Sequence, residues 1–307
     1  MVNEPGHTEG VQLLVKEVDS KLTSLGMAIL WLKIAKIRLK KPPYYKFSVC
    51  ALSNMMSSVC QYEALKYVSF TLQVMSKSCK VVPVMIMGLI MSNCNMKKYK
   101  PYEWLVAFIV SIGMAMFFYS EDGKAVDNTV SGCILLLIYI TLDSFTPNKQ
   151  KEIYQEFKVT PAEMMCFVNL FACIFMGLHL LINGGFYDGL KNMIADPYFA
   201  LELGTLALCS ALGQVCIYQT LKYFDPVTLS FLMALKQIIL VSITMIFSED
   251  GSGLNWVAKI GICIVFIGVM ANIGFKYKDQ KKKSKLISDE EQGLNPTNQE
   301  ETQNKDF

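Results

Sequence analysis

Residues 160–183 read TPAEMMCFVNLFACIFMGLHLLIN, and after Glu163 this stretch contains no lysine, arginine, aspartate or glutamate. A helix needs about 20 predominantly apolar residues to cross the roughly 30 Å hydrocarbon core of a bilayer. Thr160 and Glu163 have the spacing of a capping box, and Pro161 stands at the first helical position. The stretch therefore predicts a membrane-spanning helix over 162–183.

Similar apolar segments lie on both sides of this one. The chain has 307 residues, of which 52% are hydrophobic and 18% charged, whereas a soluble domain carries about a quarter charged residues. Lys21, Lys33 and Lys36 interrupt the first apolar segment, which is the weakest. The sequence thus predicts an all-α, polytopic transmembrane helical bundle of about nine helices. The other eight are expected near 20–37, 45–67, 70–92, 102–119, 130–147, 199–223, 226–248 and 254–276.

Charge alternates between successive connections of this predicted bundle. The connections near 33–46, 97–100 and 149–158 are rich in lysine, as is the stretch from Lys276 to Lys285, whereas the alternate connections are lysine-poor and mostly acidic. Loops rich in lysine and arginine face the cytosol. The basic loops and the C-terminus are therefore predicted to be cytosolic. The modest formal net charge of +3 gives no reason to expect a nucleic-acid partner.

A short sequence repeat indicates two related halves. Ala64-Leu65-Lys66-Tyr67 recurs as Thr220-Leu221-Lys222-Tyr223, and the same offset places Lys80 on Lys236. The charge pattern puts the two copies on opposite sides of the membrane, which is typical of secondary transporters with inverted repeats. We expect a tail over 1–19, a transporter domain over 20–276 with halves of about 20–125 and 126–276, and a disordered cytosolic tail over 277–307. Symmetry requires one further N-terminal helix, which we expect to be missing.

Three lysines are predicted to lie deep in the membrane. Lys77 and Lys80 share one helical face, roughly 10–15 Å from the helix start at 1.5 Å per residue, and Lys236 reaches a similar depth from the other side. Each such charge costs about 2.5–3.5 kcal/mol. The acids Glu63 and Asp143 cannot neutralise three lysines that face one cavity, so the excess charge favours an anionic substrate with several charges. The alternative is that these lysines snorkel to the interface or form ion pairs.

Other polar side chains are candidates for contacts with a base or a ribose. They are Gln61, Tyr62, Gln214, Tyr218 and Gln237, which alternatively serve as hydrogen-bonding links between helices. The cysteines show no C-x-x-C spacing and only two histidines occur, so the sequence favours neither a metal site nor a cofactor. It also shows no nucleophile–base constellation, and we therefore do not expect an enzyme.

Several motifs resemble the nucleotide-sugar transporter family, in particular its branch that carries adenosine 3′-phospho 5′-phosphosulfate (PAPS). They are CQYEALKYVSF at 60–70, the run from Gln73 to Val84 with Lys77, Lys80 and Pro83, Asp143-Ser144-Phe145-Thr146, and CSALGQ at 209–214. The resemblance extends from about residue 44 to 276. Three features depart from the family: the family's first helix is expected to be missing, Thr71-Leu72-Gln73 replaces Pro-Thr-Gln, and Lys236 replaces an arginine.

The resemblance implies ten helices in two inverted halves and a defined activity. It implies an antiporter that moves PAPS from the cytosol into the Golgi lumen in exchange for an adenine nucleotide monophosphate, with Lys77, Lys80 and Lys236 holding the phosphate and sulfate groups. Alternatives are transport of a nucleotide sugar or ATP/ADP, or a non-transporting shortened isoform that acts as a membrane scaffold or regulator. We expect a multi-pass protein of the Golgi membrane, or alternatively of the ER membrane. Its expected partners are the lipid bilayer and, as one alternative for its oligomeric state, a second copy of the chain in a homodimer.

Overall fold

The computed structural model describes residues 5–36, 43–68, 72–73, 76–77, 80–92, 99–119, 130–182, 197–247, 260–261, 263–275 and 278. Within these ranges all regular elements are helices, which confirms the predicted all-α fold. The labelled helices are α1 (Pro5–Ile34), α2 (Tyr44–Ala64), α4 (Val81–Met91), α5 (Pro101–Tyr119), α6 (Val130–Phe157), α7 (Pro161–Ile182), α9 (Pro197–Tyr223) and α10 (Pro226–Phe247). A further apolar helix comprises Cys263–Phe275. Apart from residue 278, the predicted tail over 277–307 lies outside the described residues.

Local sequence signals explain where several helices begin. The predicted capping box is present at α7: the backbone amide of Thr160 donates to Glu163 Oε2 at 2.8 Å, and the amide of Glu163 donates to Thr160 Oγ1 at 3.3 Å. These two bonds satisfy donors that a helix start otherwise leaves unpaired. Helices α7 and α10 both have proline as their first residue, Pro161 and Pro226, where the missing amide hydrogen costs no helical bond.

Two helices are longer than the sequence suggested. Helix α1 begins at Pro5 rather than near residue 20, and α6 continues through Pro147 to Phe157. The extension of α6 is stabilised by packing, because Asn148, Gln150, Ile153 and Tyr154 are all buried on it. The third predicted helix differs in another way: α4 covers only Val81–Met91, and the described residues before it that are helical are 72–73 and 76–77.

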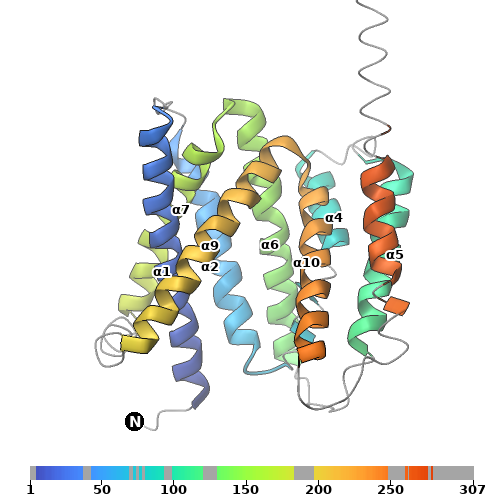
Figure 1. Cartoon of the computed structure of the whole chain (residues 1–307), viewed down its shortest axis with the longest axis horizontal. Coiled ribbons are helices and arrows are strands. Elements are labelled where there is room, and N and C mark those ends of the chain that lie inside the picture. Colours follow the sequence, from blue (N-terminus) through green and yellow to red (C-terminus); the bar gives the residue numbers. More distant parts are fainter. Residues whose placement is uncertain are drawn as a thin grey trace, which may run out of the picture.

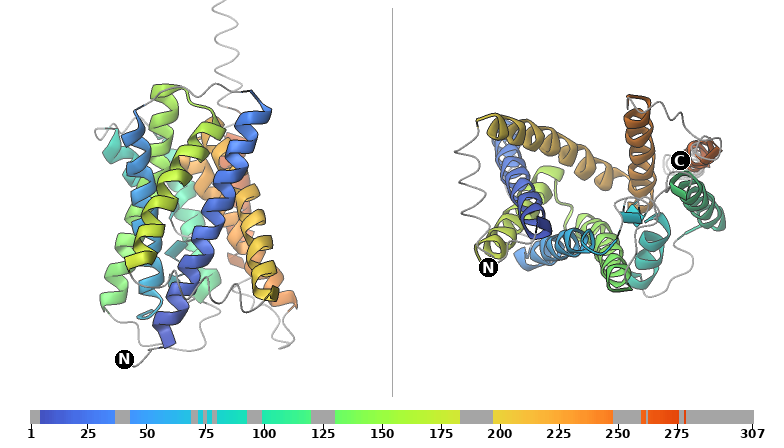
Figure 2. Two further views of the ribbon diagram at one scale, coloured as in Figure 1. Left: turned by 90° about the vertical axis from the view of Figure 1, so that its left-hand side faces the viewer. Right: turned by 90° about the horizontal axis from the view of Figure 1, so that it is seen from below.

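The helices run mostly along one direction and alternate in sense (Figures 1 and 2). Helix α6 lies between two groups. One contains α1, α2, α7 and α9, and the other contains α4, α5, α10 and the helix Cys263–Phe275. Helices α2 and α9 run in opposite directions, so the two copies of the Leu-Lys-Tyr repeat lie at opposite ends of the bundle (Figure 1).

Lysines gather at one end of this bundle, the upper end in Figure 1. Helices α1, α6 and α9 end there, and α2, α7 and α10 begin there. The described lysines on these helix ends and turns are Lys33, Lys36, Lys46, Lys149, Lys151, Lys158 and Lys222. The charge alternation in the sequence therefore corresponds to a real asymmetry between the two ends of the molecule.

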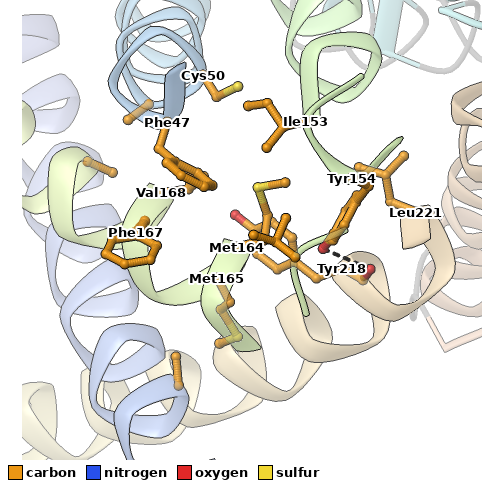
Figure 3. Packing of buried hydrophobic residues seen from close by; sticks show 14 of the residues in the cluster. Phe47, Cys50, Ile153, Tyr154, Met164, Met165, Phe167, Val168, Tyr218 and Leu221 are labelled. Carbon is orange, nitrogen blue, oxygen red and sulfur yellow. Dashed lines mark hydrogen bonds between the residues drawn. The ribbon is translucent and has the colours of Figure 1, made fainter. Parts of the chain in front are cut away.

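Each group of helices has a large apolar cluster at its core. In the first, Phe47 and Cys50 of α2 meet Ile153 of α6, Met164 and Met165 of α7, and Leu221 of α9 (Figure 3). In the second, valines and alanines of α4, α5, α10 and the helix Cys263–Phe275 pack together. A Cβ atom added at Gly113 or Gly268 would lie within 3 Å of valine side chains across the α5 contact. Such close approach of backbones is how helices associate where both core and lipid are apolar.

The outer faces of the bundle are strongly apolar. Leu105, Leu137 and Leu178 are each more than half exposed, as are many other leucines and isoleucines. Three helices of the described part, Val130–Phe157, Pro161–Ile182 and Leu201–Tyr223, are long and apolar enough to cross a membrane. Apolar surface of this extent on a helical protein is explained by contact with lipid, so the chain is a multi-pass membrane protein.

Candidate functional site

A cavity of about 300 Å³ lies where the two groups of helices meet. Helices α1, α2, α6, α7, α9 and α10 line it, together with Lys80, the residue directly before α4. Its volume is at the lower end of the range for small-molecule sites. Its lining is mixed, with charged and amide groups among aliphatic side chains. The lining residues are Lys21, Asn54, Lys80, Asp143, Thr146, Pro147, Gln150, Val168, Gln214, Ile217, Tyr218, Leu229, Ser230 and Met233.

An ion pair between α4 and α6 dominates the charge of the cavity. The ammonium group of Lys80 donates to Asp143 Oδ2 at 2.9 Å. The two side chains retain 22% and 25% of their exposed surface, so both can be reached from the cavity. Lys80 precedes the first turn of α4, and its carbonyl accepts from the amide of Val84 at 3.0 Å. The pair is therefore fixed to two helices and open to a guest.

Two prolines shape the backbone around this ion pair. Pro147 lies inside α6 and lines the cavity. Since proline has no amide hydrogen, it cannot donate to the carbonyl of Asp143 four residues earlier. Pro83 falls in the first turn of α4, where the missing hydrogen costs no helical bond. The chain is thus locally weakened at Asp143 and begins a new helix after Lys80.

Amide and phenol groups of α9 form the wall facing Lys80. Asn169 of α7 donates to Gln214 Oε1 at 2.9 Å. The NH₂ group of Gln214 therefore points away from Asn169, where it can donate to another acceptor. The side chain of Tyr218 is buried, and its hydroxyl forms a hydrogen bond with Gln150. The backbone carbonyl of Tyr218 accepts from the Tyr154 hydroxyl at 3.3 Å (Figure 3). These bonds hold the wall rigidly and present an aromatic ring beside amide groups.

Helix α1 contributes a second cation that the sequence analysis did not select. Lys21 lines the cavity, and its ammonium lies 4.0 Å from Glu17 Oε1. Both oxygens of Glu17 already accept hydroxyl groups of α2, from Ser58 at 2.8 Å and from Tyr62 at 3.0 Å. Lys21 was interpreted only as an interruption of a weak apolar segment. Its spacing from Glu17 (i, i+4) was the available signal that this stretch is helical.

The predicted binding residues are divided among several places. Lys80, Gln214 and Tyr218 line the cavity. Lys77 lies nearby, half-buried and close enough to Asp143 and Lys80 to interact electrostatically. The predicted residues that are not among those lining the cavity are Lys77, Lys236, Gln61, Tyr62 and Gln237.

Each of these outlying residues has a defined position. Lys236 is exposed on α10. It lies on the same helical face as the cavity residues Leu229 and Met233, one turn further along. Tyr62 donates to Glu17, and the carbonyl of Gln61 accepts from Gln73 at 2.9 Å. Gln237 is partly exposed beside Lys236.

The cavity suits an anion with an aromatic or polar body. Two lysines and one aspartate line it, so its described lining carries a net positive charge. The ammonium groups provide point charges for phosphate-like oxygens, and the amides and the Tyr218 ring provide hydrogen bonds and a flat surface. Among the described residues no group of histidine, cysteine and acidic side chains is arranged to hold a metal ion.

Known proteins of similar sequence and fold identify the family of this chain. Residues 20–276 match the UAA transporter family. The chain belongs to the UAA transporter family. A crystal structure of another protein superposes on this chain with a TM-score of 0.58 over 83% of this chain and 86% of the other, at 11% sequence identity. That likeness concerns the fold alone.

Relatives of this chain include proteins named for the substrates that they carry. Adenosine 3'-phospho 5'-phosphosulfate transporter 1 of Drosophila melanogaster is 39% identical, covering 76% of this chain and 50% of the relative. The Homo sapiens protein of the same name is 35% identical, covering 80% and 56%. The chain thus spans about half the length of these two relatives. UDP-galactose/UDP-glucose transporter 5B of Arabidopsis thaliana is 29% identical, covering 73% and 66%.

Proposed function

We propose that this UAA transporter moves PAPS from the cytosol into the Golgi lumen in exchange for an adenine nucleotide monophosphate. The observation that carries the proposal is the cavity with Lys21, Lys80 and Asp143 at the junction of the helix groups. PAPS is a polyanion with a purine, so it matches both the net positive lining and the ring and amides of α9. Relatives from Drosophila melanogaster, Homo sapiens and Caenorhabditis elegans carry the name of a PAPS transporter.

Within this proposal, the phosphate and sulfate groups are held by lysines and the nucleoside by α2, α9 and α10. Lys80 contacts these anionic groups, with Lys77 beside it and Lys236 one turn beyond the cavity on α10. Gln214 and Tyr218 contact the base. Gln61, Tyr62 and Gln237 contact the cargo once the two halves have moved. Transport occurs by alternating access, in which the halves near 20–125 and 126–276 rock around the cargo.

The orientation of the bundle in the membrane is inferred from the distribution of lysines. The upper end in Figure 1, with Lys33, Lys46, Lys149 and Lys158, is assigned to the cytosol because basic loops remain on that side. The C-terminus is accordingly cytosolic. Placement in the Golgi membrane is part of the proposal, because lumenal sulfation there consumes PAPS.

A nucleotide sugar is the second candidate cargo. The Arabidopsis thaliana relative named UDP-galactose/UDP-glucose transporter 5B supports it. The diphosphate of such a cargo would also pair with Lys80. The two candidates differ in the base, which the Gln214 and Tyr218 wall would have to distinguish.

Reconstitution of the purified chain tests the proposal. Liposomes preloaded with adenosine monophosphate should accumulate radiolabelled PAPS faster than empty liposomes. Unlabelled PAPS should inhibit this uptake at lower concentration than UDP-galactose or ATP. Uptake of labelled UDP-galactose in place of PAPS would favour the second candidate, and uptake that is equal in empty and preloaded liposomes would contradict exchange.

A further inference from the structure

We propose that Asp143 is a built-in counter-anion that occupies Lys80 in the empty carrier and is displaced by an anionic group of the cargo. The inference rests on the proposed function insofar as it requires an anion to enter the cavity. It assigns to Asp143 a role in regulating the same site.

The position of the ion pair distinguishes it from the others of the described chain. Lys46 pairs with Glu156, Lys66 with Glu63 and Lys149 with Glu152, and none of these six residues lines the central cavity. In the wider Lys21–Glu17 pair, at 4.0 Å, only the lysine lines it. In the Lys80–Asp143 pair both partners line it, at 2.9 Å and with part of each side chain exposed. A guest anion that reaches Lys80 therefore has to compete with a carboxylate that is already there.

The pair also joins the two proposed halves. Lys80 precedes α4, in the half near 20–125, and Asp143 lies on α6, in the half near 126–276. Helices α4 and α6 pack directly against each other. Pro147 removes the helical bond to the carbonyl of Asp143, so the backbone that carries this carboxylate is less constrained than the rest of α6. Opening of the Lys80–Asp143 pair therefore changes the contact between the two halves. It occurs at the position where the backbone of α6 is least constrained.

Competition of this kind gives a carrier a way to release a polyanion. When the cargo takes Lys80, the freed Asp143 carboxylate lies next to the incoming negative charge and repels it. The cargo is consequently bound less tightly than the lysines alone would bind it, and re-formation of the Lys80–Asp143 pair accompanies its departure. A site of lysines without this carboxylate would retain the cargo and turn over slowly.

Binding measurements on the purified full chain in detergent test this role. The probes are PAPS and inorganic pyrophosphate, and the readouts are the apparent Kd and the increase in melting temperature at saturation. Asp143→Asn removes the competing charge, so it should bind both probes on the order of tenfold more tightly than wild type, or about 1.4 kcal/mol. Without ligand it should melt below wild type, because Lys80 loses its partner.

Glu156→Gln is the matched control. It lies on the same helix and also breaks a pair with a lysine of the other half, Lys46, but outside the cavity. It should bind both probes like wild type. If Asp143→Asn does not fold, Lys80→Gln and Lys80→Gln/Asp143→Asn provide the same comparison without an unpaired lysine. The double variant should then show the tighter residual binding.

The outcomes separate this inference from the proposed function. A folded Asp143→Asn protein with unchanged or weaker binding overturns the inference, even where wild type takes up PAPS. Tighter pyrophosphate binding by Asp143→Asn supports it, even where wild type takes up no PAPS and the proposed function fails. Failure of both proteins to bind either probe also overturns it, since the inference requires an anion at Lys80.

Discussion

At the scale of single residues, the site depends on how each charge is compensated. Lys80 has Asp143 at 2.9 Å, whereas the nearest carboxylate of Lys21 is Glu17 at 4.0 Å. Glu17 is further satisfied by the hydroxyl groups of Ser58 and Tyr62. Lys21 therefore has the weaker internal partner and is the cation that a guest reaches at lower cost. Lys80 has to exchange one anion for another.

Gly88 shows how closely side chains approach beside the site. A Cβ atom there would lie 2.1 Å from the Tyr99 hydroxyl and 2.9 Å from Asn148 Oδ1. Asn148 in turn donates to the carbonyls of Val84 at 3.0 Å and Ser144 at 2.9 Å. This glycine lets α4, α6 and the start of α5 come together.

We expect Gly88→Ala to destabilise the protein by roughly 1–3 kcal/mol, because the added methyl group overpacks the contact. Thermal unfolding in detergent, followed by intrinsic fluorescence, measures the effect. Adding Tyr99→Phe removes the clashing oxygen and should restore part of the loss. Gly177→Ala is the control, since a Cβ atom there meets nothing within 4 Å. Equal melting temperatures for Gly88→Ala and Gly177→Ala would refute this account of the contact.

At the scale of helices, α6 is the element that combines structure and mechanism. It carries Asp143, Thr146, Pro147 and Gln150 into the cavity. Beyond the cavity, Lys151 donates to the carbonyls of Leu221, Lys222 and Phe224 at 2.8–3.1 Å. This cation satisfies carbonyls at the end of α9 that have no helical donor. One helix thus joins the site to the turn between α9 and α10.

Replacement of Pro147 should separate stability from transport. Pro147→Ala restores an amide donor for the carbonyl of Asp143, and a helix gains up to about 3 kcal/mol from such a change. We therefore expect a higher melting temperature together with a several-fold slower uptake of PAPS, because α6 stiffens at the ion pair. Pro161→Ala, at the first position of α7, should change neither property appreciably. A Pro147→Ala protein that is less stable and transports at the wild-type rate would contradict this role.

Sequence reasoning located helices well where hydropathy alone determines them. Helix α7 was expected over 162–183 and spans Pro161–Ile182, and its capping box is present. Sequence reasoning was less successful where contacts between residues far apart in the sequence determine the ends of a helix. The start of α1 is polar, and its helix is supported by Ser58 and Tyr62 of α2, which bind Glu17. Proline and lysines suggested that α6 ends near 147, but buried Ile153 and Tyr154 stabilise it to Phe157.

The candidate site could be predicted only in part for the same physical reason. Lys80, Gln214 and Tyr218 stand out as polar groups within apolar helices, and they meet in the cavity. Asp143 was recognised as an intramembrane acid, but its pairing with Lys80 depends on how α4 packs on α6, which periodicity does not reveal. Lys21 was interpreted as an interruption of a weak apolar segment, and Gln150 lies in a stretch that was predicted to be a loop.

At the scale of the whole molecule, the arrangement fits a carrier with a central site. Apolar side chains cover the outside, lysines gather at one end, and the charged cavity lies between two groups of helices. One copy of the Leu-Lys-Tyr repeat directly follows α2 and the other ends α9, and these two helices run in opposite directions (Figure 1). Inverted halves around this cavity are the arrangement that the proposed alternating access requires.

The measurement that tests the central claim most directly is PAPS uptake by liposomes that contain Lys80→Gln in place of wild type. Loss of one charge-assisted contact of about 1.5–3 kcal/mol should reduce uptake by roughly 10–100-fold. Lys33→Gln, which removes an exposed lysine at the end of α1, should transport like wild type. Equal uptake by folded Lys80→Gln and Lys33→Gln proteins would show that the cargo does not bind at this cavity.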